Sequence, residues 1–199
     1  MKVYLMRHGL TDWNLSRRMQ GRSDIPLNET GLAQARAAAE GMKELPLDYI
    51  AASPLIRTQQ TAQTVASFFD LPVHKEERLI EMGFGDLEGV VITEHPLCRC
   101  IFDDPCGYKP LGDGETYEDM NRRAQIILDE VIRPLEQQNH HDVLLVSHGA
   151  VIRSVVAILT QLKLADFWRN PPQKNCSVTV LDCTDGVITL EEEGRIYAK

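Results

Sequence analysis

Side chains suited to binding an anion follow three separate apolar runs of the chain. The runs are Val3–Met6, Tyr49–Ala52 and Val143–Val146, and the side chains that follow them are Arg7 and His8, Arg57, and His148. Ligands of open α/β sheets bind outside the carboxyl ends of the strands. If each run is a strand, these four side chains are expected to converge on a single site.

The residue types of this group favour a phosphoryl ligand. Arginine offers a planar fork of donors that matches phosphate oxygens, and a neutral histidine carries a lone pair that can attack phosphorus. Arg57 is expected in the first turn of a helix, where a cation opposes the helix dipole. That placement is reasonable if the helix N-terminus and the guanidinium bind one anion together. Taken singly, Arg57 is equally well a surface arginine, and His8 or His148 a structural histidine. The repetition at three strand ends favours the anion site.

The rest of the sequence supplies the elements that would position these residues. Apolar runs alternate with helical patterns, as in an α/β fold. The predicted helices are Glu29–Leu45, a helix that begins at Ser53-Pro54 with Ser53 as N-cap and ends near Phe69, Thr116–Leu135 and Ala150–Leu162. The remaining predictions are a strand-like piece from Leu71, an irregular segment over Val90–Gly112, and a hairpin of Val178–Leu181 and Val187–Leu190 around Asp185-Gly186.

We therefore predict one domain over residues 1–199, a three-layer α/β/α sandwich around a mostly parallel central sheet. Residues 90–112 are expected to cross one end of the sheet as a lid that sets substrate specificity. That segment contains Arg99, Phe102, Tyr108 and Lys109, but no pattern that identifies a substrate.

Composition excludes several classes of protein. The chain has 199 residues, of which 43% are hydrophobic and 25% charged, close to the average for globular proteins. Its formal charge of −8, from 21 Lys and Arg against 29 Asp and Glu, argues against nucleic acid as a partner. No apolar run approaches the roughly 20 residues of a membrane span, and the N-terminus lacks a signal-peptide pattern, so a cytoplasmic location is expected.

The cysteines suggest free thiols rather than disulfides. There are five, an odd number, in a chain expected to remain in the cytoplasm. Cys98, Cys100 and Cys106 lie close together in the sequence, with His95 nearby, so a zinc cluster is conceivable. Their spacing matches none of the usual zinc-ligand pairs.

The order of motifs resembles the histidine phosphatase superfamily, in the branch that contains the cofactor-dependent phosphoglycerate mutases and many small phosphatases. The matching segments are Arg7-His8-Gly9 with Thr11-Asp12-Trp13-Asn14, Gln20-Gly21, Asp24, Pro26-Leu27, Gly31 and Gln34-Ala35; Ser53 to Ala62; Glu81 to Gly89; Gly112 to Thr116; and Ser147-His148-Gly149. Apart from Gly112 to Thr116, which resembles a further segment of the family, these are four motifs in the family's order between residues 7 and 149. Four ordered motifs are specific, whereas a lone Arg-His-Gly is not.

This resemblance implies a role for each site residue. His8 would take the phosphoryl group, and Glu81 would donate and accept the proton. Arg7, Arg57 and His148 would bind the phosphoryl oxygens, and Asn14 with Gln20 and Gly21 would complete the rim. The resemblance implies no metal ion and no cofactor, and a small phosphorylated metabolite as substrate.

Several functions remain open at this stage. The leading prediction is a phosphomonoesterase, and the nearest alternative is a mutase that returns the phosphoryl group to a second hydroxyl. Phe84-Gly85 followed by Glu88-Gly89 is similar to the small phosphatases, including the α-ribazole phosphatases, and Gln20 departs from the threonine usual in mutases. Leu87 stands where those phosphatases commonly have tryptophan. A non-catalytic phospho-ligand module and a metal site at His8, His148 and Glu81 are further alternatives; adjacent arginines disfavour the metal.

Overall fold

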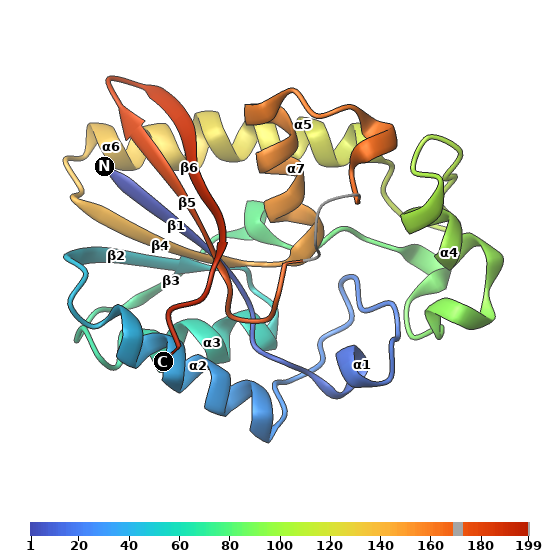
Figure 1. Ribbon diagram of the computed structural model, residues 1–199, viewed down its shortest axis with the longest axis horizontal. Helices are drawn as coiled ribbons and strands as arrows, with labels where there is room; N and C mark the ends of the chain where they lie inside the picture. The colour runs from blue at the N-terminus through green and yellow to red at the C-terminus, as the bar shows by residue number, and fades with distance from the viewer. Residues whose placement is uncertain (169–172, 199) are drawn as a thin grey trace.

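A six-stranded sheet runs through the centre of the protein in the order β3-β2-β4-β1-β5-β6 (Figure 1). The computed structural model describes residues 1–168 and 173–198. The strands are β1 (Lys2–Arg7), β2 (Leu47–Ala52), β3 (Val73–Lys75), β4 (Asp142–Ser147), β5 (Val178–Thr184) and β6 (Val187–Arg195). The four strands from β3 to β1 pair in parallel, and β5 pairs antiparallel with both β1 and β6. The predicted mostly parallel sheet and closing hairpin are confirmed.

The central strands are apolar because helices cover both of their faces. All six residues of β4 are buried, and its side chains alternate between two separate cores. Val143 and Leu145 pack in one core, while Leu144 and Val146 pack in the other. A strand buried on both faces reads as a continuous apolar run, which is why this sequence predicted it well.

Two layers of helices enclose the sheet, which confirms the three-layer α/β/α architecture (Figure 1). One layer consists of α2 (Glu29–Met42) and α3 (Ile56–Ala66), whose alanine-rich faces form one core with the sheet. The other consists of α5 (Tyr117–Ile127), α6 (Arg133–Gln137) and α7 (Gly149–Thr160). None of the described helices is both long and apolar enough to cross a membrane.

The predicted helix over Thr116–Leu135 is continuous but irregular in its middle. Thr116 and Asp119 form a capping box that starts α5, as each side chain accepts a hydrogen bond from the other's backbone. A π-helical stretch, Leu128–Ile132, then connects α5 to α6. Pro134 lies two residues beyond this stretch. Proline has no N–H to donate to the preceding turn, and a wider turn accommodates that loss.

The start of α3 differs from the prediction. The helix begins at Ile56 and its N-cap is Leu55, which makes no side-chain capping bond, so the expected N-cap at Ser53 is wrong. The Ser53 hydroxyl lies 2.8 Å from Nε2 of His148 instead, across the end of β4. A tertiary hydrogen bond therefore uses the oxygen that would have capped the helix. Arg57 still falls in the first turn.

The lid segment is more regular than its sequence suggested. The expected irregular stretch contains a short 3-10 turn, Ile92–Glu94, and the helix α4 (Pro96–Asp103). Nδ1 of His95 accepts a hydrogen bond from Leu97 N at 3.2 Å and so caps α4. Figure 1 shows α4 and the short helix α1 (Asp12–Leu15) beyond the carboxyl ends of the central strands. This arrangement encloses the space in front of β1 and β4.

The loop after β1 packs closely against the first turn of α2. A Cβ atom on Gly31 would lie 2.1 Å from the carbonyl oxygen of Leu10, and one on Gly9 would lie 2.6 Å from the carbonyl oxygen of Gly31. The side chain of Asn28 caps this turn by accepting from Gly31 N at 2.9 Å. Only glycine permits this approach, which holds the backbone that follows His8.

We expect Gly31→Ala to destabilise the protein by about 1–3 kcal/mol through overpacking, although alanine is the better helix former by about 1 kcal/mol. Chemical denaturation measures the effect. The matched control is Ala33→Gly on the exposed side of the same helix, which should cost only about 0.5–1 kcal/mol. A Gly31→Ala protein more stable than the parent would show that this contact does not constrain the loop.

Candidate active site

A cavity of about 430 Å³ lies at the carboxyl ends of β1, β2 and β4. Seven of the eight predicted site residues line it: Arg7, His8, Asn14, Gln20, Gly21, Arg57 and Glu81. The eighth, His148, is fully buried behind this surface, and its ring centroid lies 5.3 Å from that of His8. The predicted convergence of the three strand ends is therefore present in the structure.

His8 is fixed in one orientation with one ring nitrogen left for the cavity. Its Nδ1 lies 2.7 Å from the carbonyl oxygen of Gly9. Nδ1 therefore carries the proton and donates a hydrogen bond to that oxygen. Its backbone N donates to Ser147 O, and Asn175 Nδ2 donates to its carbonyl at 2.9 Å. Burial, with the charges of Arg57 and Arg7, holds the pKa of His8 well below its usual range. Nε2 therefore keeps its lone pair at neutral pH.

Arg57 has no exposed surface, and each of its three guanidinium nitrogens donates one hydrogen bond to the protein. Its Nη1 donates to Ser23 O at 2.8 Å and its Nη2 to Gly21 O at 2.6 Å. Its Nε donates to Nδ1 of His148 at 3.2 Å. Burial lowers the pKa of Arg57 to about 10, which leaves it charged at neutral pH.

Both ring nitrogens of His148 have protein partners. Because Nδ1 accepts from Arg57, Nε2 carries the proton and donates to Ser53 Oγ. Burial and the charge of Arg57 hold the pKa of His148 well below its usual range. In this structure His148 orients Arg57 and does not line the cavity, so its predicted contact with the phosphoryl oxygens stays a prediction.

A negatively charged side chain of the protein itself lies at the N-terminus of α3, where the sequence predicted a bound anion. The carboxylate of Asp24 accepts from Ile56 N at 2.6 Å, at the first residue of the helix. Asp24 thus occupies part of the terminus at which an external anion was expected, and joint binding of such an anion by this terminus and Arg57 stays a prediction. Arg57 faces the cavity, while Asp24 complements the dipole of α3.

Glu88 shapes the loop that holds Arg57. Its carboxylate accepts from the backbone of Arg22 and of Ser23 at 2.8 Å each, and from the Ser23 hydroxyl at 2.6 Å. A Cβ on Gly21, which has a φ of +53°, would lie 2.0 Å from Oε1 of Glu88. Glu88 thus fixes the two carbonyls that bind Arg57, a role that the motif alone did not reveal.

Arg7 contributes the second guanidinium of the cavity. Its Nη1 donates to Gln173 O at 2.5 Å, and its Nε is buried without a hydrogen-bond partner among the described residues. Burial lowers the pKa of Arg7, and the carboxylate of Glu81 acts in the opposite direction. Arg7 therefore brings a positive charge to the cavity that it lines.

Glu81 lies opposite the arginines at the start of α7. Its Oε1 accepts from Met82 N at 2.9 Å and its Oε2 from Ala150 N at 3.4 Å. Burial raises the pKa of Glu81, although these two N–H groups and the charges of Arg57 and Arg123 lower it. A carboxyl group of raised pKa beside a bound anion is suited to hold and release a proton.

Two amide side chains complete the floor of the cavity. Oδ1 of Asn14 accepts from the Thr11 backbone at 3.2 Å, and Oε1 of Gln20 accepts from the Thr11 hydroxyl at 3.0 Å. With both oxygens turned toward Thr11, the amide nitrogens are the groups that remain for a ligand. The cavity is thus lined mostly by donors at its inner end.

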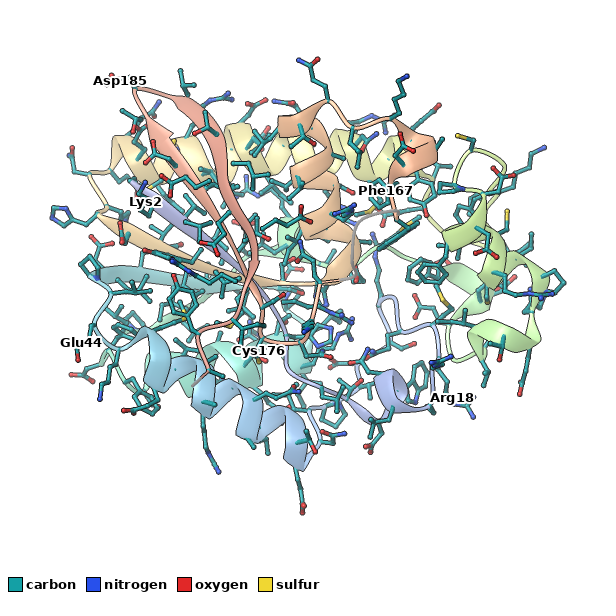
Figure 2. The ribbon with its side chains drawn as sticks, viewed as in Figure 1. Lys2, Arg18, Glu44, Phe167, Cys176 and Asp185 are labelled. Atoms are coloured by element: carbon teal, nitrogen blue, oxygen red, sulfur yellow. The ribbon has the colours of Figure 1, made fainter. Side chains whose placement is uncertain are left out.

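The outer wall is built from residues that the sequence did not single out for this place. Only Ile92, Phe102 and Asp103 of the lid line the cavity, whereas Arg99 and Lys109 are exposed elsewhere and Tyr108 is buried in the core. Arg18, Arg153, Trp168 and Gln173 form the remainder, together with Met19 and Phe84. Figure 2 shows Cys176 beside the ends of the central strands and Arg18 further out, beside α1.

The cysteines form no disulfide and, among the described residues, no metal cluster. All five are free thiols, and Cys98 is buried while Cys106 is exposed. No group of three His, Cys, Asp or Glu side chains in residues 1–168 and 173–198 is arranged to hold a metal ion. The zinc alternative at Cys98, Cys100 and Cys106 therefore has no support in the geometry.

These features define a class of protein: a doubly covered α/β sheet with a neutral histidine facing one buried and one half-buried guanidinium group at the strand ends. A model of the histidine phosphatase superfamily (branch 1) matches residues 3–194. The chain belongs to this family. The resemblance found in the sequence motifs is confirmed over nearly the whole chain.

Some relatives within the family are named as phosphatases and others as phosphoglycerate mutases. The uncharacterized phosphatase PhoE of Bacillus subtilis (strain 168) is 34% identical over 194 residues, covering 98% of this chain and 91% of the relative. The probable phosphoglycerate mutase GpmB of Enterobacter sp. (strain 638) is 33% identical over 192 residues, covering 92% of this chain and 85% of the relative. The solved structure of Bacillus stearothermophilus YhfR is similar with a TM-score of 0.89 at 30% identity, covering 100% of this chain and 99% of that chain.

The low pKa of His8 predicts how stability depends on pH. Between that pKa and the usual value near 6.5, the unfolded chain binds a proton that the folded protein does not. Stability is therefore lost as the pH falls through this window, by up to about 1.4 kcal/mol per pH unit for each such proton. His148 acts in the same direction, whereas the raised pKa of Glu81 acts in the opposite one.

We expect His8→Asn to reduce the loss of unfolding free energy between pH 6.5 and pH 5.5. Asparagine does not titrate, and its amide can replace the bond from Nδ1 to Gly9 O. Urea denaturation at several pH values measures the slope, with circular dichroism at pH 7.5 as the control for folding. Equal slopes in the two proteins would contradict a depressed pKa at His8.

Proposed function

We propose that this protein is a phosphomonoesterase that works through a phosphohistidine at His8, with Glu81 as proton donor and acceptor and no metal ion. Its family places it among enzymes of phosphoryl transfer. The observation that carries the proposal is the orientation of His8. With Nδ1 bound to Gly9 O, the only ring nitrogen able to attack a ligand is Nε2, in a cavity with two guanidinium groups.

In the first step, Nε2 of His8 donates its lone pair to phosphorus and the bond from phosphorus to the ester oxygen breaks. The carboxyl proton of Glu81 moves to the departing oxygen, so an alcohol leaves and not an alkoxide. Arg7 and Arg57 stabilise the charge on the phosphoryl oxygens, which would otherwise repel the nucleophile. Their positive charge supplies the stabilisation that a metal ion provides in other phosphatases.

In the second step, water attacks the phosphohistidine. The Glu81 carboxylate takes a proton from the water, the N–P bond breaks, and His8 recovers its lone pair as inorganic phosphate forms. The enzyme returns to its starting protonation state, with Glu81 protonated and His8 neutral. Both steps need a carboxyl group with a pKa high enough to hold a proton, which the burial of Glu81 supports.

Water is favoured over a second alcohol as the acceptor because the lid supplies no cation. A mutase must exclude water and hold a doubly phosphorylated intermediate. Among the described residues, the lid contributes Ile92, Phe102 and Asp103 to the cavity, two apolar groups and a carboxylate. The presence of both His8 and Glu81 in the cavity favours an enzyme over a module that only binds. We propose a small phosphorylated metabolite as the substrate, in keeping with the size of the cavity.

Hydrolysis is tested against transfer in a buffer that contains EDTA. The protein should release inorganic phosphate steadily from p-nitrophenyl phosphate and from one or more metabolites of a phosphoester panel. With 3-phosphoglycerate and catalytic 2,3-bisphosphoglycerate it should form little 2-phosphoglycerate. The His8→Asn protein, which lacks the nucleophile, is the control and should be inactive. Rapid interconversion of the phosphoglycerates, with negligible phosphate release from any ester, would make the mutase alternative correct.

The role of Glu81 predicts a dependence on the leaving group. Glu81→Gln removes the transferable proton and keeps the shape, so we expect kcat/KM for alkyl phosphates to fall by about 10²–10⁴-fold. The rate at which p-nitrophenyl phosphate phosphorylates His8 should fall much less, since p-nitrophenolate leaves without protonation. A burst of p-nitrophenolate in rapid mixing isolates this step. An equal loss for alkyl and nitrophenyl esters in that step would exclude Glu81 as the proton donor.

A further inference from the structure

Glu81 lies on a stretch of backbone that belongs to no helix or strand. Residues 80–84 have no regular secondary structure, so their peptide groups depend on other segments for hydrogen-bond partners. Arg123 on α5 donates to three carbonyl oxygens of the segment that ends at Glu81. These are Arg78 O at 3.4 Å, Ile80 O, and Glu81 O at 3.3 Å. A single guanidinium thus holds the backbone that carries the proposed proton donor.

Arg123 is in turn held by Glu115. Its Nη2 donates to Oε2 of Glu115 at 2.8 Å, and the two side chains are only 14% and 16% exposed. The same oxygen accepts from Gly83 N at 2.8 Å, and Glu115 N donates to Gly83 O at 2.8 Å. Oε1 of Glu115 lies 3.2 Å from Nη2 of Arg22. Glu115 therefore anchors the chain two residues after Glu81 and, through Arg123, at Glu81 itself.

This ion pair lies behind the cavity and not in it. Neither Glu115 nor Arg123 is among the residues that line the cavity, so contact with a ligand does not explain why a pair that is costly to desolvate is largely buried. The carboxyl group of Glu81 reaches the cavity with hydrogen bonds from Met82 N and Ala150 N. Its place there depends on where its own backbone lies. Misplacing a reacting group by about 1 Å can cost roughly 10²-fold in rate.

We propose that Glu115 and Arg123 are positioning residues that hold the carboxyl group of Glu81 where it can transfer a proton to the ester oxygen. This inference rests on the proposed phosphatase function, in which Glu81 is the proton donor. Arg123 makes the contact with the Glu81 backbone, and Glu115 keeps Arg123 and the following loop in place. Both act on the substrate only through Glu81, and this is the property that a merely structural ion pair would lack.

The first measurement compares an alkyl phosphate, whose leaving group needs a proton, with p-nitrophenyl phosphate, whose leaving group does not. All the partners of the Glu115 carboxylate are donors, so the amide of Glu115→Gln must turn its own N–H groups toward at least one of them. We expect kcat/KM for the alkyl phosphate to fall by about tenfold or more. The rate of the p-nitrophenolate burst, which reports phosphorylation of His8, should stay close to that of the parent.

The second measurement takes Glu81 out of the comparison. A Glu81→Gln protein has no carboxyl proton left to position, so adding Glu115→Gln to it should lower kcat/KM for the alkyl phosphate no further. A general loss of structure would instead lower the rate by the same factor in both backgrounds. The double variant therefore separates positioning of Glu81 from support of the fold.

Arg122→Gln is the matched control. Arg122 lies next to Arg123 on α5, pairs with Asp119 and is 71% exposed, so its loss removes one positive charge from the same helix and should leave the rates for both esters unchanged. Arg123→Lys tests geometry against charge. The charge of Arg123 lowers the pKa of Glu81, and lysine keeps this charge but not the planar fork of donors. We expect Arg123→Lys to behave as Glu115→Gln does.

Two results would overturn the inference while leaving the phosphatase intact. One is a folded Glu115→Gln protein whose alkyl-ester rate and nitrophenolate burst fall equally, or do not fall. The other is an equal loss from Glu115→Gln in the parent and in the Glu81→Gln background. Thermal unfolding shows which variants are folded, and Arg123→Lys decides by the same measurements if Glu115→Gln is not. If Glu81→Gln itself shows no dependence on the leaving group, the proposed role of Glu81 is wrong, and this inference fails with it.

Discussion

A positive charge buried at Arg57 is the constraint on which the site depends. A guanidinium removed from water needs hydrogen-bond partners at each edge, because its desolvation is costly. Two backbone carbonyls and the ring of His148 meet that need. The carbonyls belong to a loop that Glu88 shapes, and Ser53 sets the tautomer of His148. These side chains act on the ligand through the arginine that they hold.

The same charge explains how an acidic protein can bind an anion. The chain has a net charge of −8, so its long-range field repels phosphate esters. Attraction must therefore be local, and it is strongest where water is excluded. Arg57, which is fully buried, and Arg7, which is half-buried, supply it. Burial of His8 together with these two charges lowers the pKa of His8 and keeps its ring uncharged. In the proposed mechanism, the same electrostatic arrangement would bind the phosphoryl group and preserve the lone pair of His8.

A structural feature could be predicted from the sequence when neighbouring residues in the chain cause it. The runs ending at Met6, Ala52 and Val146 are apolar because both faces of the sheet are covered. Their strands were therefore predictable, and so was the convergence of the side chains that follow them. Helix α4 was missed because it is only eight residues long and begins at a proline. The bonds from Ser53 to His148 and from Asp24 to Ile56 join distant segments, and no local pattern reports them.

The backbone of His8 is held from both sides by segments synthesised much later. Its N–H donates to Ser147 O, and its carbonyl accepts from Asn175. Loops that close over such long stretches of chain form slowly, because their entropy is lost before any contact is gained. Both backbone contacts of His8 come from residues beyond 140 of the chain, so neither can form until those segments have been synthesised. A chain that ends before Asn175 would therefore lack one of the two contacts that position the ring of His8.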